Sequence, residues 1–167
     1  NTPCFYNHFV TDREESFDQP GTPEEPKGHY IFDKPEPLWN FGHGKSYTTF
    51  DYVDCALSDT LLVASDTLKV SVTIKNTGRR DGKEVVQLYV RDKVSTVATP
   101  IQQLKAFQKV LIKPGESQCV ELSLPIAELA LYNAKMEEVV EPGDFEIQIG
   151  AASDDIRFKK TITINRK

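Results

Sequence analysis

Polar and apolar residues alternate along most of the chain after residue 46, with the period of two that is typical of β-strands. The clearest example is residues 68–75, where four apolar side chains would share one face of a strand: Leu68, Val70, Val72 and Ile74. The same alternation predicts strands over 84–91, 103–112, 117–124, 144–150 and 156–165, and an earlier strand that begins at Tyr47. One face of each strand is expected to meet a core and the other to meet water.

Turn residues separate these predicted strands. Residues 113–116 and 141–144 each contain proline followed by glycine, and the connection 76–82 contains two glycines. Only residues 125–131 suggest a short helical turn. About seven alternating strands with short connections predict an all-β fold, an antiparallel β-sandwich of the immunoglobulin or fibronectin type III kind.

The first 45 residues differ from the rest in composition. Five prolines lie between positions 20 and 37, where they remove backbone donors and fix φ, so neither a helix nor a central strand is expected. We therefore predict two parts, an irregular proline-rich arm and linker over residues 1–45 and a β-sandwich over residues 46–167. The opening Asn1-Thr2-Pro3 suggests a piece of a longer protein.

Overall composition narrows the classes of function. The chain has 167 residues, 39% of them hydrophobic and 27% charged, as in globular domains. Its 20 Lys and Arg against 25 Asp and Glu give a net charge of -5 without a basic cluster, so no nucleic-acid partner is predicted. No apolar run approaches the roughly 20 residues of a membrane-spanning helix.

The sequence predicts no metal, no other cofactor and no disulfide framework. The cysteines are Cys4, Cys55 and Cys119, without the spacing of a zinc site. The histidines are His8, His29 and His43, which could converge with Cys4 on a metal only if the proline-rich arm gave them a rigid frame. Cys119 lies at an outward-facing position of its predicted strand. Cys55 is interpreted as a small apolar residue within a strand.

No catalytic residue is predicted either. Four pairs of adjacent acidic residues lie in polar loops, where a solvated carboxylate keeps its ordinary chemistry. Neighbours on a strand also point to opposite faces, so adjacency does not make an acid–base pair. The pairs begin at Glu14, Glu24, Glu137 and Asp154.

Residues 37–50, "PLWNFGHGKSYTTF", are the candidate functional stretch. Gly42 and Gly44 flank His43, but no strand precedes them and no helix follows, so a phosphate-binding loop is not expected. The aromatic residues Trp39, Phe41 and Tyr47 could form a flat platform for a sugar ring, or they could pack the arm against the sandwich. Packing is the more common role of aromatic residues. Trp39, Phe41, His43 and Tyr47 are the candidate site residues.

The same stretch resembles the junction that precedes the last domain of glycoside hydrolase family 3 β-glucosidases and β-xylosidases. Three later segments, "VTIKNTGRRDGKEVVQLYV", "QQLKAFQKVLIKPGES" and "VVEPGDFEIQIGAASDDIR", resemble the fibronectin type III-like domain that ends those enzymes. Residues 5–8, "FYNH", are similar to the segment that closes their second catalytic domain. The resemblance covers nearly the whole chain in the family's order. Three residues depart from it: Trp39 stands where tyrosine or phenylalanine is usual, Asn40 where proline is common and Lys45 where leucine is typical.

This resemblance implies a parent enzyme that cleaves β-glycosidic bonds with retention, using two carboxylates. Neither catalytic segment is present here, so the chain should be inactive by itself. Its expected role is that of a non-catalytic accessory domain that packs on the catalytic domains of the same chain and stabilises them. The resemblance also implies a secreted or periplasmic location, but the sugar that the parent cleaves stays undetermined.

Two other functions are compatible with a sandwich fold, since fold alone does not fix function. One is a carbohydrate- or surface-binding module. Six aromatic residues follow Phe50, but no cluster is evident, and core packing is the default for the four that lie in well-patterned strands: Tyr89, Phe107, Phe145 and Phe158. The other is an adhesion domain unrelated to enzymes, which would leave the "YNH" and "FGHG" motifs to chance.

Overall fold

The computed structural model describes residues 6–7 and 37–166. Cys4, His8, His29 and most of the predicted arm therefore lie outside the described residues. The elements are β1 (Phe50–Leu57), β2 (Leu61–Leu62), β3 (Thr67–Asn76), β4 (Gly82–Asp92), β5 (Gln103–Ile112), β6 (Ser117–Pro125), the 3-10 helix η2 (Ile126–Leu129), β7 (Leu131–Tyr132), β8 (Glu138–Val139), β9 (Gly143–Gly150) and β10 (Ile156–Ile164). Within this part of the chain, no helix is long and apolar enough to cross a membrane.

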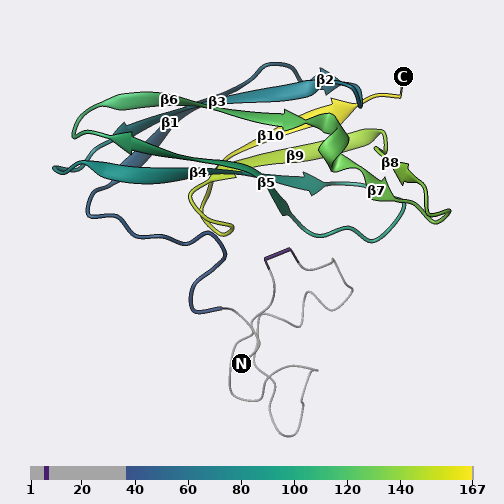
Figure 1. The fold of residues 1–167 in the computed structure, drawn as a ribbon, viewed down its shortest axis with the longest axis horizontal. Helices are drawn as coiled ribbons and strands as arrows, with labels where there is room; N and C mark the ends of the chain where they lie inside the picture. Colours follow the sequence, from purple (N-terminus) through teal and green to yellow (C-terminus); the bar gives the residue numbers. More distant parts are fainter. Residues whose placement is uncertain (1–5, 8–36, 167) are drawn as a thin grey trace, which may run out of the picture.

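The strands form two facing layers (Figure 1). One layer has the order β1-β3-β6, and the other has the order β2-β10-β9-β4-β5. The long strands pair antiparallel throughout, while the two-residue β2 pairs parallel with β10. A small hairpin, β7–β8, lies apart from both layers. The predicted sandwich is confirmed, and so is the helical turn, which is η2.

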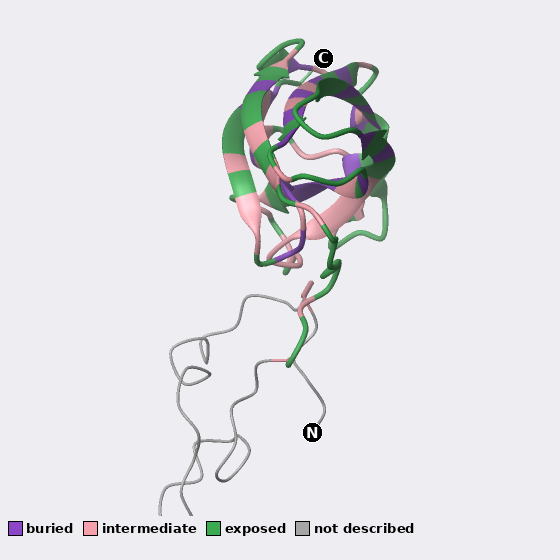
Figure 2. Ribbon diagram, turned by 90° about the vertical axis from the view of Figure 1, so that its left-hand side faces the viewer, coloured by how far each residue is buried: buried purple, intermediate pink, exposed green. Residues whose placement is uncertain are grey.

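The core lies between the two layers and follows the alternation along the sequence. Leu68, Val70, Val72 and Ile74 are fully buried. Val70 lies opposite Leu122 on β6, and Val72 lies opposite Val120. Burying an aliphatic side chain of this size contributes about 1.5–3 kcal/mol. The end-on view of Figure 2 shows buried stretches, in purple, alternating with exposed ones along the curved strands.

The first long strand begins at Phe50, three residues later than Tyr47, where the sequence placed it. Residues 47–49 make no ladder, although the carbonyl of Thr49 accepts a hydrogen bond of 2.9 Å from the backbone of Thr77. A register shift between Tyr52 and Asp54 then changes which parity faces the core. Cys55 is consequently buried, whereas Cys119 is exposed, as predicted for both.

The connection between β3 and β4 is closed by one buried polar side chain. Asn76 Nδ2 donates to the carbonyls of Arg80 and Ile112, each at 2.8 Å. Its Oδ1 accepts hydrogen bonds from the Gly78 backbone at 3.0 Å and from Thr48 Oγ1 at 2.7 Å. A Cβ at position 78 would lie only 2.1 Å from Thr48 Oγ1, so the backbone passes this closely only at a glycine.

The centre of β4 departs from the predicted pattern, in which each strand has a solvated face. Val86 and Leu88 face the core as expected, but Gln87 and Tyr89 on the outer face are buried as well. The expectation of core packing for Phe107 is also wrong, because it lies opposite Gln87 on edge strand β5 and is exposed. The outer face of the five-stranded layer is therefore partly covered and partly apolar.

Candidate functional site

Residues 37–49, here called the junction, run across the outer face of the five-stranded layer. Figure 1 shows the junction beside the β9–β10 loop, on the side away from β1, β3 and β6. The carbonyl of Phe41 accepts a hydrogen bond of 2.9 Å from the backbone of Ser153. The carbonyl of Gly42 accepts one of 3.1 Å from Gln87 Nε2. These bonds attach the junction to β4 and to the β9–β10 loop.

Gly42 fits over a buried pair of polar side chains on β4. Tyr89 Oη donates to Gln87 Oε1 at 2.6 Å, and Gln87 Nε2 also donates to the carbonyl of Ala151. Gly42 has a φ of 82°, and a Cβ there would lie 2.1 Å from Gln87 Oε1. Burial raises the pKa of Tyr89, with smaller contributions from Tyr6 and Asp154, so its hydroxyl stays a neutral donor. Only glycine meets both the conformation and the space at position 42.

Phe41 and Tyr6 form an aromatic contact above this pair. Their rings stack with centroids 4.0 Å apart and an interplanar angle of 11°. The Tyr6 ring meets the Tyr89 ring edge-on, at 6.0 Å and 71°. Tyr89 is thus covered from outside by an aromatic residue that is 83 positions away in the sequence.

Trp39 and His43 form a second aromatic contact. Their rings stack at 4.5 Å, and Lys45 Nζ lies 4.7 Å from the centroid of the Trp39 ring. Asn40 Nδ2, between them in sequence, donates to Asp154 Oδ2 at 2.7 Å. The structure therefore brings Trp39 and His43 together, sets Phe41 with Tyr6, and leaves the Tyr47 side chain exposed. The three aromatic residues considered for a sugar platform, Trp39, Phe41 and Tyr47, thus have three different surroundings.

A pocket of about 390 Å³ opens beside the junction. Its volume falls within the roughly 300–1,000 Å³ of small-molecule sites. The lining comes from the junction, the first half of β4, β5 and the β9–β10 loop. Its charged residues are Lys45, Asp81, Lys83, Glu84 and Lys109.

Glu84 belongs to a polar cluster that the sequence did not reveal. It has the same parity as Val86, and it accepts a hydrogen bond of 3.0 Å from Tyr52 Oη on the opposite layer. Burial raises the pKa of Glu84 and also that of Tyr52. Arg157 lies 5.7 Å from the Tyr52 ring and pairs with Asp155 at 2.6 Å. The signal in the sequence was a carboxylate at a core-facing position.

This cluster does not form an acid–base pair for catalysis. The Glu84 carboxylate is bound by Tyr52, and the Asp155 carboxylate is bound by Arg157. Among the residues that the structure describes, no group of three His, Cys, Asp or Glu side chains could hold a metal ion. The arrangement ties the two layers together at the junction end.

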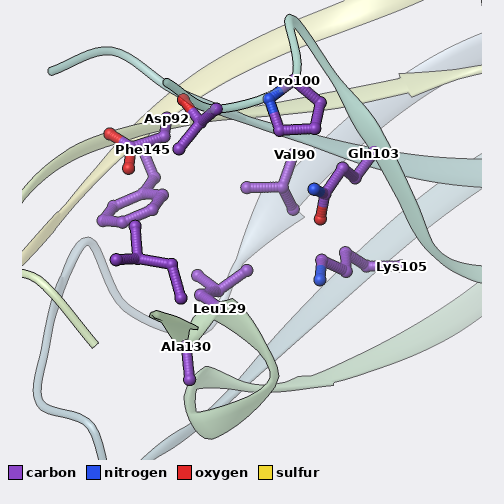
Figure 3. Close-up of a pocket in the computed structure, with 10 residues that line it drawn as sticks. Val90, Asp92, Pro100, Gln103, Lys105, Leu129, Ala130 and Phe145 are labelled. Atoms are coloured by element: carbon purple, nitrogen blue, oxygen red, sulfur yellow. The ribbon is translucent and has the colours of Figure 1, made fainter. Parts of the chain in front are cut away.

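Two further hollows lie elsewhere. Figure 3 shows the first, about 60 Å³ in volume, between Val90, Phe145 and Leu129. Burial lowers the pKa of Lys105 there, and its Nζ donates to the carbonyl of Glu128 at 2.7 Å. This hollow is smaller than ligand sites usually are.

The second hollow, about 540 Å³ in volume, lies between residues 94–96 and residues 139–142. Glu141 lines this hollow and accepts a hydrogen bond of 2.9 Å from the Thr96 backbone on its other side. Hydrogen bonds from Thr96 lower the pKa of Glu141, so its carboxylate is engaged in holding the loop.

The chain is similar in sequence to a known domain family and to known enzymes. A family model described as "Fibronectin type III-like domain" matches residues 84–153. A β-xylosidase of Formosa agariphila is 43% identical over 143 residues, which is 84% of this chain and 19% of that protein. A periplasmic β-glucosidase of Salmonella typhimurium is 35% identical over 158 residues, which is 93% of this chain and 20% of that protein.

Solved structures of β-glucosidases also resemble this chain. The structure of a β-glucosidase from Listeria innocua in complex with glucose superposes with a TM-score of 0.79 and 34% identity, covering 98% of this chain and 22% of that one. The chain therefore spans about a fifth of the length of the relatives that it matches.

Proposed function

Because the chain belongs to the C-terminal, fibronectin type III-like region of family 3 glycoside hydrolases, the β-glucosidases and β-xylosidases, we propose that it packs on the catalytic domains of its own protein and stabilises them. Residues 46–167 form the accessory sandwich, and residues 1–45 link it to the preceding catalytic domain. The Salmonella relative is named as periplasmic. We propose a secreted or periplasmic location for this protein, supported by that likeness.

The exposure of the junction carries this proposal. Trp39 is 57% exposed, Phe41 45% and Tyr47 91%, although the backbone that bears them is fixed to the sandwich. A fixed backbone that presents aromatic side chains to the outside is typical of an interface. We assign Trp39, Phe41, His43 and Tyr47 as contacts with the catalytic domains.

We propose that the parent protein cleaves β-glycosidic bonds, in keeping with the names of its relatives. The resemblance to family 3 implies that it does so with retention of configuration. Such enzymes need two carboxyl groups about 5–5.5 Å apart on either side of the bond. Two of the partly buried carboxylates that the structure describes, those of Glu84 and Asp155, are bound by Tyr52 and Arg157 instead. Neither of these two carboxylates is therefore free to act in such a pair.

Deleting residues 51–166 from the full-length protein tests the proposal. Loss of the packed domain should lower both the thermal unfolding temperature and the glycosidase activity of the remainder. Unchanged stability together with full activity would contradict the stabilising role.

Carbohydrate binding by the sandwich is the second candidate, and one observation favours it. The Tyr47 ring is exposed at the rim of the 390 Å³ pocket, where a sugar ring could stack. The contacts of His43 and Lys45 with the Trp39 ring weigh against a wider platform. Affinity electrophoresis of the chain in soluble glucan separates the two candidates, because only a binding module is retarded.

Trp39 is suited to a matched test of the interface. Trp39→Ala in the full-length protein should lower its unfolding temperature by several degrees, because the surface of the catalytic domains would lose its contact with the indole. Tyr132→Ala serves as the control, because Tyr132 is 61% exposed and lies on the separate β7–β8 hairpin. In the 167-residue chain alone, Trp39→Ala should lower the unfolding temperature less, because only the contacts of Trp39 with His43 and Lys45 are lost there. Equal effects of the two substitutions in the full-length protein would argue against the assignment.

A further inference from the structure

Strands β4 and β5 present one continuous outer face next to the junction. In an antiparallel pair, residues directly opposite each other project to the same side. The opposite pairs along this face are Lys83 with Leu111, Val85 with Lys109, and Gln87 with Phe107. Gln87 donates a hydrogen bond to the junction. Lys83, Val85 and Lys109 line the pocket beside the junction.

Two apolar side chains on this face are exposed to solvent. Phe107 is 67% exposed and Leu111 is 54% exposed, although core positions of the same strand, such as Val110, are buried. Tyr47 approaches the face from the junction, because it lines the same pocket as Val85 and Lys109. Exposed aromatic and aliphatic groups gathered on one rigid sheet mark an interaction surface.

The same surface has an excess of lysines, although the whole chain has a net charge of -5. Three lysines line its pocket against Asp81 and Glu84, and the Glu84 carboxylate is bound by Tyr52. Lys45, Lys83 and Lys109 come from three different segments and line one pocket. Within residues 6–7 and 37–166, the ion pairs involve Lys69, Arg157 and Lys159 but none of these three lysines. Lysines at the edge of an apolar patch select a partner of opposite charge.

We propose that this β4–β5 outer face docks against an acidic surface of the catalytic domains of the same protein. The inference rests on the proposed accessory function and adds the face and the charge of its partner. The face is continuous with the junction, because Gly42, Gly44 and Tyr47 line the pocket together with Lys83 and Lys109. About four fifths of the length of the relatives lies outside the region matched here, so a large body is expected beside the junction. Phe107 and Leu111 fill the apolar centre of the contact, and the lysines form its charged rim.

Hydroxyl-radical footprinting of the full-length protein and of the 167-residue chain tests this directly. Tyr47, Phe107 and Leu111 should each be modified several-fold more slowly in the full-length protein. Leu61 and Tyr132 are matched controls, with exposures of 57% and 61%, and their rates should not change. Protection of Leu61 or Tyr132 in place of Phe107 and Leu111 would overturn the assigned face while leaving the accessory function intact. Equal rates at every position, the junction included, would overturn both.

A charge-reversal pair tests the acidic partner. Lys83→Glu with Lys109→Glu in the full-length protein should return the modification rates of Phe107 and Leu111 to those of the isolated chain. Lys69→Glu with Lys75→Glu is the control on the three-stranded layer and should leave those rates unchanged. Thermal unfolding of the isolated chain with each pair verifies that the sandwich still folds. Persistent protection in a folded Lys83→Glu, Lys109→Glu protein would overturn the charge assignment.

Discussion

Gly42 connects the sequence to the candidate site at the scale of a single residue. Its positive φ and its distance from Gln87 each exclude a larger side chain. By contrast, a Cβ at Gly44, two residues later, would meet no atom within 4 Å. The two glycines of the "FGHG" motif therefore have different roles, and only the first is required by the contact with β4.

Gly42→Ala should detach the junction from β4. We expect a loss of about 1–3 kcal/mol in the free energy of unfolding, because a left-handed conformation would be imposed on alanine next to a buried side chain. Gly44→Ala is the matched control and should stay within about 0.5 kcal/mol of the parent chain. Urea unfolding followed by circular dichroism measures both, and similar losses for the two variants would refute the distinction.

Met136 is the non-glycine residue with a positive φ among the described residues, at 61°. It lies in the β7–β8 turn, where the Met136 amide donates to the carbonyl of Asn133 at 2.9 Å and Asn133 Oδ1 accepts from the backbones of Lys135 and Glu137. Met136→Gly should raise the free energy of unfolding by about 0.5–1 kcal/mol, since glycine avoids the cost of the left-handed conformation. Lys135→Gly should give no such gain. Thermal unfolding of the two variants compares them.

At the scale of elements, the Tyr52–Glu84 hydrogen bond links β1 of one layer to β4 of the other. Burial is the main cause that raises the pKa of Glu84. The hydrogen bond from Tyr52 opposes this effect, the carboxylate of Asp155 adds to it, and Arg157 opposes it. The folded state therefore binds this proton more tightly than the unfolded state does. The contribution of Glu84 to stability is greatest below its ordinary pKa of 4.5 and is lost as the pH rises through the raised value.

Glu84→Gln should remove this pH dependence. The amide keeps an acceptor for Tyr52 but carries no charge, so the stability of the variant should fall less than that of the parent chain as the pH rises from about 4 toward neutrality. Glu138→Gln on β8 is an exposed control. Denaturant midpoints across this pH range provide the measurement, and parallel curves for Glu84→Gln and the parent chain would contradict the expectation.

For the molecule as a whole, the fold is a two-layer sandwich whose five-stranded layer has a partly covered, partly apolar outer face. The junction, the β9–β10 loop and the β4–β5 outer face all lie on the same side of the five-stranded layer. This position suits a domain that acts by contact with a neighbour rather than by chemistry of its own.

The 167-residue chain should therefore show no turnover of an aryl β-glucoside or an aryl β-xyloside. Among its described carboxylates, that of Glu84 is bound by Tyr52 and that of Asp155 by Arg157, so neither is free to act in an acid–nucleophile pair. A chromogenic assay at high protein concentration, with the full-length enzyme as positive control, measures this. Turnover that copurifies with the folded chain would refute the accessory role.

Taken alone, the sequence determined the fold class and most of the core. The alternation in β3 and β6 and the turn residues between strands depend on neighbours in the chain, so Leu68, Val70 and Leu122 could be assigned to the interior before any contact was known. Only the tertiary structure decided how the outer face is used. The contact of Gly42 with Gln87 joins residues 45 positions apart, and that of Tyr52 with Glu84 joins residues 32 apart. A period of two carries no information about such distant pairs, because it fixes the side of a strand but not what covers that side. The "PLWNFGHGKSYTTF" stretch could thus be recognised from its residues, whereas the separate roles of Trp39, Phe41, Gly42 and Tyr47 required the sheet beneath them.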